Sequence, residues 1–255
     1  MTSENLPQVL RDEVPLVVRS EVEPNRPYNE YKQPLRRDFF HSCAYCTMSE
    51  SEAQAIRFTI DHYEPRSARP DLSNTYSNLM WACDECNRRK GDRTPPEEAR
   101  KDGLRFFRPD EDVYLQHFHR EGLRLVADSN IGWFSLEALD LNREALKRLR
   151  ELRQRLSECD EAVTAGILAL TKFPIDRLPN HIKGPAVRAI RQLSAARTNT
   201  VEAIEALLRE NAKSPYLDED EEAASRATDR SKKLKEAEAL YPGQDWRAPR
   251  KTKKP

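Results

Sequence analysis

The sequence predicts an α+β protein in which a zinc-stabilised module is followed by a small β-hairpin and a helical carboxy-terminal region. Three observations predict this fold class. Two Cys-x-x-Cys pairs enclose a short strand-forming run, an alternating segment follows at residues 113–126, and apolar residues recur every three or four positions after residue 135. Such patterns are typical of a metal-bound module, a hairpin and amphipathic helices, respectively.

The cysteine pairs indicate a structural zinc ion. Cys43 and Cys46 form the first pair, and Cys83 and Cys86 form the second. Four thiolates in two closely spaced pairs match the tetrahedral ligand set of Zn²⁺. Two disulfides or redox dithiols are the alternative. The sequence shows neither a signal peptide nor a redox-fold context, so reduced thiols that bind zinc are the favoured interpretation.

An Asp-His step lies between the two cysteine pairs. Residues 57–60 are rich in strand-forming side chains, and Asp61 and His62 follow them directly. Neighbouring residues on a strand point to opposite sides, so a twist or bulge has to turn both side chains toward one site if they act together. By itself, such a pair is typical of a surface turn.

The second cysteine pair carries further polar residues. The run NLMWACDECN, from Asn78 to Asn87, is expected to form a helix that begins near Asn78. Zinc bound at Cys83 and Cys86 would fix the backbone that presents Asn87. Residues 88–90, Arg-Arg-Lys, add positive charge beside it.

Taken together, these motifs resemble the HNH endonucleases. The matching pattern is CAYC…IDHYEP…N…CDECNRRKG, within residues 43–91, and its parts occur in one order. The resemblance implies a ββα-metal fold and metal-dependent hydrolysis of phosphodiester bonds in DNA. It also implies a setting in bacterial restriction or anti-phage defence, where such proteins sometimes have an ATPase partner.

The resemblance implies a role for each polar residue of the motif. His62 would be the general base, Asp61 and Asn87 would bind a catalytic divalent cation, and Asn78 would brace the loop that holds His62. The chemistry agrees, because a histidine with a pKa of about 6.5 can accept a proton from water at neutral pH. Carboxylate and amide oxygens are hard ligands, which favour Mg²⁺ or Mn²⁺.

Three cations are expected to contact the substrate. Lys90 takes the position of the family's trailing lysine, and Arg66 and Arg69 follow the Asp-His step in the run PRSARP. Arginines in this position could contact the scissile strand through its phosphates. The alternative is that these loop arginines are simply solvated.

Composition limits the other classes of function. The chain has 255 residues, enough for one or two domains, and its 43 cations balance 43 anions. Nucleic-acid binding therefore has to be judged segment by segment. No apolar run is long enough to span a bilayer, and cytoplasmic residence is expected. A non-catalytic zinc module that binds nucleic acid or a protein is the alternative function, and an RNA-directed nuclease is a third.

The expected domain organisation follows these patterns. Asn142 is expected to cap a long amphipathic helix over residues 143–172, and a second helix is expected over residues 186–211. These two helices would pack as a hairpin or offer a surface for self-association or for a partner protein. The expected parts are an extended arm (1–30), the nuclease module with its zinc (31–110), the β-hairpin (111–134), the helical hairpin region (135–213) and a charged, flexible tail (214–255).

Overall fold

The computed structural model describes residues 14–53, 56–171, 184–185, 188 and 220–248. The chain divides into two compact units, of which the first combines Met1–Leu146 with Glu219–Pro255 and the second is Lys147–Asp218. The second helix that we expected, over residues 186–211, lies almost entirely outside the described residues. The account below therefore concerns the first unit and helix α7.

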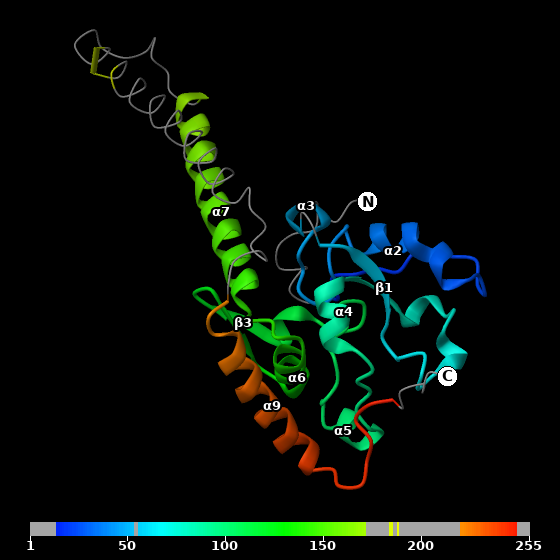
Figure 1. Ribbon diagram of the computed structural model, residues 1–255. Coiled ribbons are helices and arrows are strands. Elements are labelled where there is room, and N and C mark those ends of the chain that lie inside the picture. Colours follow the sequence, from blue (N-terminus) through cyan, green and yellow to red (C-terminus); the bar gives the residue numbers. More distant parts are fainter. Residues whose placement is uncertain (1–13, 54–55, 172–183, 186–187, 189–219, 249–255) are drawn as a thin grey trace. The chain divides into compact units, whose positions relative to one another are not determined.

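A ββα arrangement lies at the centre of the first unit. Strand β1 (Phe58–His62) pairs antiparallel with β2 (Leu79–Cys83), and His62 lies opposite Leu79 in the register. Helix α4 (Asp84–Lys90) follows β2 directly and contacts both strands (Figure 1). Acidic residues in its first turn and basic residues in its last turn complement the helix dipole. Gly91, at φ +54°, then ends the helix in a conformation that favours glycine.

The helix predicted from Asn78 is wrong in its first half, where the structure has β2. All five residues of β2 are buried, so the strand presents a continuous apolar run without alternation. Such a run cannot be told from a buried helix by periodicity alone. The second half of the predicted helix is present as α4, which begins directly after Cys83.

Short helices flank the first cysteine pair. Helices η2 (Tyr28–Tyr31) and α2 (Lys32–Asp38) precede it, and α3 (Glu50–Ala53) follows it. Helix α2 ends at Asp38, and Phe40 and His41 shortly after it both adopt positive φ angles, 51° and 54°, which an α-helix does not allow.

The described part of the amino-terminal arm lies along the module. The guanidinium of Arg19 donates to the carbonyl oxygen of Leu79 at 2.7 Å and pairs with Asp110 at 3.0 Å. It also lies over the rings of Phe39 and Tyr76. This segment is therefore attached to the start of β2, opposite His62 in the register.

The hairpin lies downstream of the ββα core. Strands β3 (Phe118–Glu121) and β4 (Arg124–Ala127) are antiparallel, and β4 contacts α6 (Asn130–Leu139). The Ser129 hydroxyl caps α6 by accepting from the Gly132 N–H at 3.1 Å. The remaining short helices are η3 (Pro70–Leu72), η4 (Tyr76–Asn78), α5 (Glu97–Lys101) and η5 (Tyr114–Gln116).

Helix α7 (Glu144–Thr171) occupies the position of the first predicted long helix. The cap predicted at Asn142 has a different partner, because its side-chain amide exchanges two hydrogen bonds of 2.8 Å with the backbone of Leu125. Asn142 therefore joins the start of α7 to the hairpin.

The predicted flexible tail contains a packed helix, α9 (Ala223–Ala239), which lies alongside α6 (Figure 1). Leu234 and Ala237 are buried, and the Lys233 ammonium donates to the Glu137 carboxylate at 2.7 Å. The strongly polar composition gave no signal for the packing of this helix, because only a narrow strip of it is apolar. None of the helices in the described residues is long and apolar enough to cross a membrane.

Candidate metal centre and catalytic pocket

The four predicted zinc ligands come together in the first unit. Their sulfur atoms all lie within 4.8 Å of one another, and all four cysteines are free of disulfides. The Sγ atoms of Cys46 and Cys83 are 3.8 Å apart. Zn–S bonds of about 2.3 Å in a tetrahedron require S···S separations of about 3.8 Å. The cluster thus fits a structural zinc ion, and the disulfide alternative does not hold.

The cluster joins the first cysteine pair to the ββα core. The Ala44 N–H donates to the carbonyl oxygen of Trp81 in β2 at 2.8 Å. Cys83 is the last residue of β2, and Cys86 lies in the first turn of α4. The buried guanidinium of Arg143 donates to the Cys86 sulfur at 3.5 Å, which offsets part of the negative charge of four thiolates.

A separate cavity of about 710 Å³ collects the predicted catalytic residues. It lies where the end of β1 faces α4, and a loop after β1 closes one side. Asp61, His62, Asn87 and Arg66 all line it. The remaining lining residues are Tyr28, Ile60, Pro65, Ser67, Pro70, Ser73, Asn74, Gly91 and Asp92.

His62 is held in one tautomer. Its Nε2 lies 2.9 Å from the carbonyl oxygen of Ser73. A carbonyl can only accept, so Nε2 carries the proton and Nδ1 carries the lone pair of the neutral ring. Burial lowers the pKa of His62, and the nearby cation of Arg66 lowers it further. The ring edge-packs against Tyr28 with centroids 5.1 Å apart.

Asp61 is buried and held from two sides. The Tyr45 hydroxyl donates to Oδ2 at 2.5 Å, and the Lys90 ammonium donates to Oδ1 at 3.2 Å. An ionised carboxylate offers about four acceptor positions, so two remain for a cation after these bonds are made.

Asn87 reaches the same cavity from α4. Its Nδ2 donates to the Thr59 hydroxyl at 3.0 Å, which leaves the carbonyl oxygen Oδ1 as the ligand atom. Thr59 and Asp61 are two residues apart on β1 and therefore share one face of the strand. The bond to Thr59 places the Asn87 amide on the face that carries Asp61.

Asn78 lies outside the cavity and holds the loop that forms its wall. Its Oδ1 accepts from the Glu64 N–H at 2.8 Å, and its Nδ2 donates to the carbonyl oxygens of Glu64 and Leu72 at 3.1 and 3.3 Å. One buried amide thus ties both ends of the segment that runs from His62 toward Ser73.

The three predicted substrate cations have different environments. Lys90 is fully buried, and its ammonium also donates to the carbonyl oxygen of His62 at 2.7 Å. Its burial leaves no exposed side-chain surface for the predicted contact with substrate. Arg69 is exposed and pairs with Asp71 at 2.6 Å outside the cavity. Only Arg66 is both exposed and part of the cavity wall.

Sequence reasoning missed three residues of this site. Tyr45 lies between the first two zinc ligands, Tyr28 comes from the amino-terminal segment, and Asp92 is an exposed carboxylate at the cavity rim. For Asp92 the sequence did contain a local indication that it lies near the site, because it directly follows Gly91, where α4 ends. Tyr28 and Tyr45 had no comparable signal, because only folding brings them to β1.

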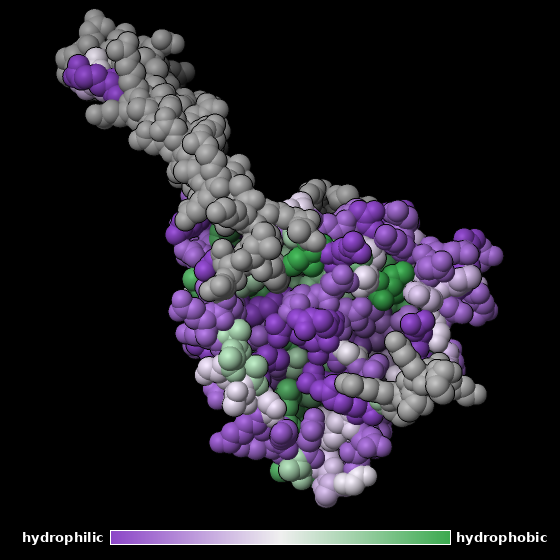
Figure 2. Space-filling model, in the orientation of Figure 1, coloured by the Kyte–Doolittle hydropathy of each residue, from purple (hydrophilic) through white to green (hydrophobic). Residues whose placement is uncertain are grey.

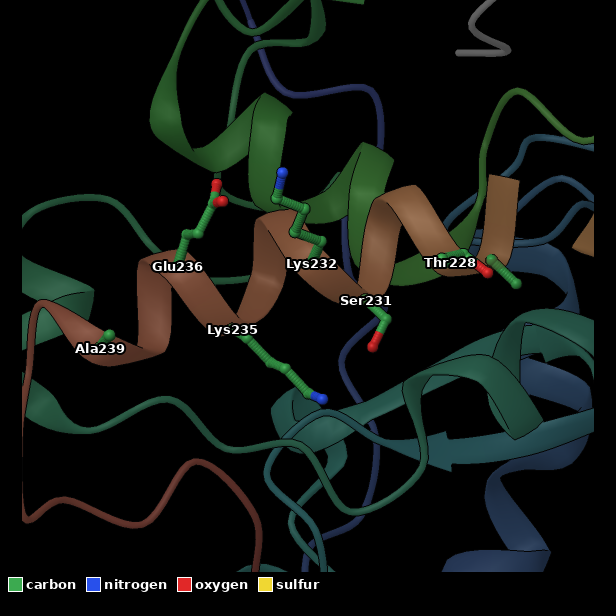
Figure 3. A pocket seen from close by; sticks show the side chains of 7 residues that line it. Thr228, Ser231, Lys232, Lys235, Glu236 and Ala239 are labelled. Atoms are coloured by element: carbon green, nitrogen blue, oxygen red, sulfur yellow. The ribbon is translucent and has the colours of Figure 1, made fainter. Parts of the chain in front are cut away.

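A second hollow, of about 680 Å³, lies along α9 (Figure 3). Its described lining comes from this one helix and includes Ser231, Lys232, Lys235 and Glu236. It offers neither a histidine nor a cluster of oxygen ligands. Elsewhere, the face shown in Figure 2 is mostly hydrophilic over the described residues. The cavity around His62 is therefore the candidate catalytic site.

The paired strands, the following helix and the four-cysteine cluster define a zinc-binding ββα module. Residues 43–93 match the family model described as HNH endonuclease, and this segment is accordingly an HNH module. No curated protein and no solved structure matches the chain.

Proposed function

We propose that this protein is a metal-dependent endonuclease that hydrolyses phosphodiester bonds in DNA. One observation carries the proposal: a buried, neutral histidine shares a cavity with the oxygen ligands of Asp61 and Asn87. A module that only binds nucleic acid or protein has no need for a base beside two hard ligands. The HNH match supports nuclease chemistry, and the choice of DNA follows the family resemblance.

His62 acts as the general base in this proposal. Its Nδ1 lone pair accepts a proton from the attacking water, and the Ser73 carbonyl stabilises the positive charge that then forms on the ring. Tyr28 limits the tilt of the ring by packing against its edge. Together these contacts hold the base in one orientation before substrate arrives.

Asp61 and Asn87 are the proposed ligands of the catalytic cation. Mg²⁺ or Mn²⁺ suits their carboxylate and amide oxygens, and when bound it supplies charge stabilisation at the scissile phosphate and the leaving oxygen. The zinc cluster is not suited to this task because four thiolates leave no open coordination position. Lys90 and Tyr45 orient Asp61, and Asn78 braces the loop beside His62.

Arg66 is the proposed substrate cation. Its guanidinium carbon lies 5.3 Å from the centre of the Tyr28 ring, which fixes the side chain at the cavity wall. The formal net charge of the chain is zero, so phosphate attraction has to come from local groups of this kind. Arg69 extends the positive surface along the same loop. The proposed setting in restriction or anti-phage defence, with an ATPase or a second copy as partner, rests on the family resemblance.

The test is plasmid cleavage by the full-length protein in Mg²⁺ or Mn²⁺. His62→Ala should lower the rate about 10²- to 10⁴-fold, the usual cost of losing a general base, and should keep its zinc. His119→Ala is the matched control, since that exposed histidine pairs with Asp128 on the hairpin. Chelation of the catalytic cation should stop cleavage by the wild type.

Equal rates for His62→Ala and wild-type protein would overturn the proposed mechanism. The non-catalytic zinc module would then be the better account of the fold.

A further inference from the structure

The segment between the first two zinc ligands carries a side chain that contacts Asp61, one of the residues that line the candidate cavity. Tyr45 lies within the Cys43–Cys46 pair, and its hydroxyl donates to Asp61 Oδ2 at 2.5 Å. Both side chains are buried, with 6% of Tyr45 and 5% of Asp61 exposed. A phenol, with an ordinary pKa of about 10, keeps its proton at neutral pH and can donate to the carboxylate.

The other oxygen of Asp61 is held from the second zinc-binding segment. The Lys90 ammonium donates to Oδ1 at 3.2 Å, and Lys90 lies four residues after Cys86 on α4. Both hydrogen-bond donors to Asp61 thus come from segments that the four-cysteine cluster anchors. The carboxylate is restrained at both oxygens, which removes the rotation it would have as a surface side chain.

We infer that Tyr45 is a positioning residue that orients Asp61 as a metal ligand and thereby couples the zinc cluster to the geometry of the catalytic cation site. This inference rests on the proposed function, because it takes Asp61 to be a ligand. The structural zinc then has a second effect beyond stabilising the fold. It holds the Tyr45 hydroxyl at the distance that fixes Asp61 before the cation binds.

Tyr63 provides a matched control for the inference. It is buried to a similar degree, with 7% exposed, and its hydroxyl donates to the carbonyl oxygen of Phe106 at 2.7 Å. Tyr63→Phe removes a buried phenol hydroxyl that does not contact Asp61. Tyr45→Phe removes the one that does, and it keeps the ring that packs against Phe106.

The experiment measures Mn²⁺ binding to the full-length, zinc-loaded protein by electron paramagnetic resonance of the free ion. Loss of a hydrogen bond to a metal ligand typically costs about 10- to 100-fold in metal affinity. Tyr45→Phe should therefore raise the Kd for Mn²⁺ by roughly that factor, whereas Tyr63→Phe should leave it unchanged. The Mn²⁺ concentration for half-maximal cleavage should rise in parallel, and the rate at saturating Mn²⁺ should recover toward the wild-type rate.

Three results separate the inference from the proposed function. A zinc-loaded Tyr45→Phe protein that binds Mn²⁺ as tightly as a cleaving wild type would overturn the inference alone. Loss of zinc from Tyr45→Phe would also overturn it, because the hydroxyl would then support the cysteine cluster rather than Asp61. A wild-type protein that neither binds Mn²⁺ nor cleaves plasmid would remove the proposed function, and the inference with it.

Discussion

The pKa of His62, which the Arg66 cation helps to lower, predicts how cleavage depends on pH. Only the neutral imidazole can accept a proton, and the pKa of His62 lies below its ordinary value of about 6.5 because of burial and the Arg66 cation. Cleavage should therefore persist as the pH falls below 6.5, and it should decline only as the pH passes through this lowered pKa.

Arg66→Gln tests the electrostatic part of that prediction. Removal of the cation should move the acidic limb of the single-turnover rate toward higher pH, because one cause of the lowered pKa is gone. The same change should reduce the salt dependence of DNA binding by about one phosphate contact. Arg69→Gln is the control for the shift of the acidic limb, since Arg69 pairs with Asp71 outside the cavity. An acidic limb centred at or above pH 6.5 in the wild type would contradict the assignment of His62.

The burial of Lys90 changes the role that its charge can have. In the sequence it extends a run of three cations that suggests contact with phosphate. In the structure its ammonium lies between Asp61, the His62 carbonyl and the ring of Phe106. A cation in that position balances the charge of the carboxylate and supports the end of β1. In the proposed mechanism, its contribution to cleavage is therefore indirect.

At the scale of elements, one carboxylate connects three helices. Asp140, at the carboxy end of α6, accepts from Arg89 of α4 at 3.1 Å, from Arg230 of α9 at 3.2 Å and from Arg226 of α9 at 3.4 Å. It is buried and adopts a positive φ of 54°. The negative charge of Asp140 thus links α9 to the helix that carries Asn87.

Asp140→Asn should release α9 from the module. Asparagine tolerates the same backbone conformation, so the substitution removes the charge and little else. Removing one partner of a fully buried ion pair typically costs about 3–5 kcal/mol. The cost here should be smaller, because the arginines are partly exposed, Arg89 keeps Glu85 and Arg226 keeps Asp220. Hydrogen exchange should accelerate across residues 223–239, and the free energy of unfolding should fall. Asp128→Asn, at an exposed ion pair on the hairpin, should change neither quantity. Unchanged protection of α9 would show that its apolar contacts suffice.

At the scale of the whole molecule, the second unit is an insertion in the first. The chain leaves the first unit after Leu146 and returns at Glu219. The two parts of the first unit meet near this interruption, because the Glu144 N–H donates to the Asp220 carboxylate at 3.4 Å. The HNH module and α9 thus belong to one compact unit despite their separation in sequence.

Replacement of residues 147–218 by a short Gly-Ser linker should leave the first unit folded. The closure of a short loop between neighbouring ends costs little entropy, and the zinc ligands and the cavity all lie in the retained part. The shortened protein should bind about one zinc ion per chain, and it should cleave plasmid in Mn²⁺. Matched measurements on the full chain provide the reference. Loss of zinc or of cooperative unfolding would show that the insertion supports the module.

The sequence alone determined the zinc ligands and identified the residues of the candidate site. Zinc binding favours pairs of cysteines at a short, fixed spacing, and this spacing is visible in the sequence. It identified Cys43, Cys46, Cys83 and Cys86. His62 and Asn87 were identified through the resemblance of their motif to the HNH endonucleases. The structure places both side chains in one cavity, as the predicted site requires. Their catalytic roles stay predictions.

Only the tertiary structure decided what surrounds those residues. It made Leu79–Cys83 a strand, because pairing with β1 outweighs a local pattern that suits either element. It buried Lys90, brought Tyr45 to Asp61 and attached α9 to α6. These features depend on contacts between residues far apart in the chain, for which neither spacing nor local propensity gives a signal. The sequence therefore shows which chemical groups the candidate site contains. How those side chains are held, and how far solvent reaches them, can be seen only in the folded structure.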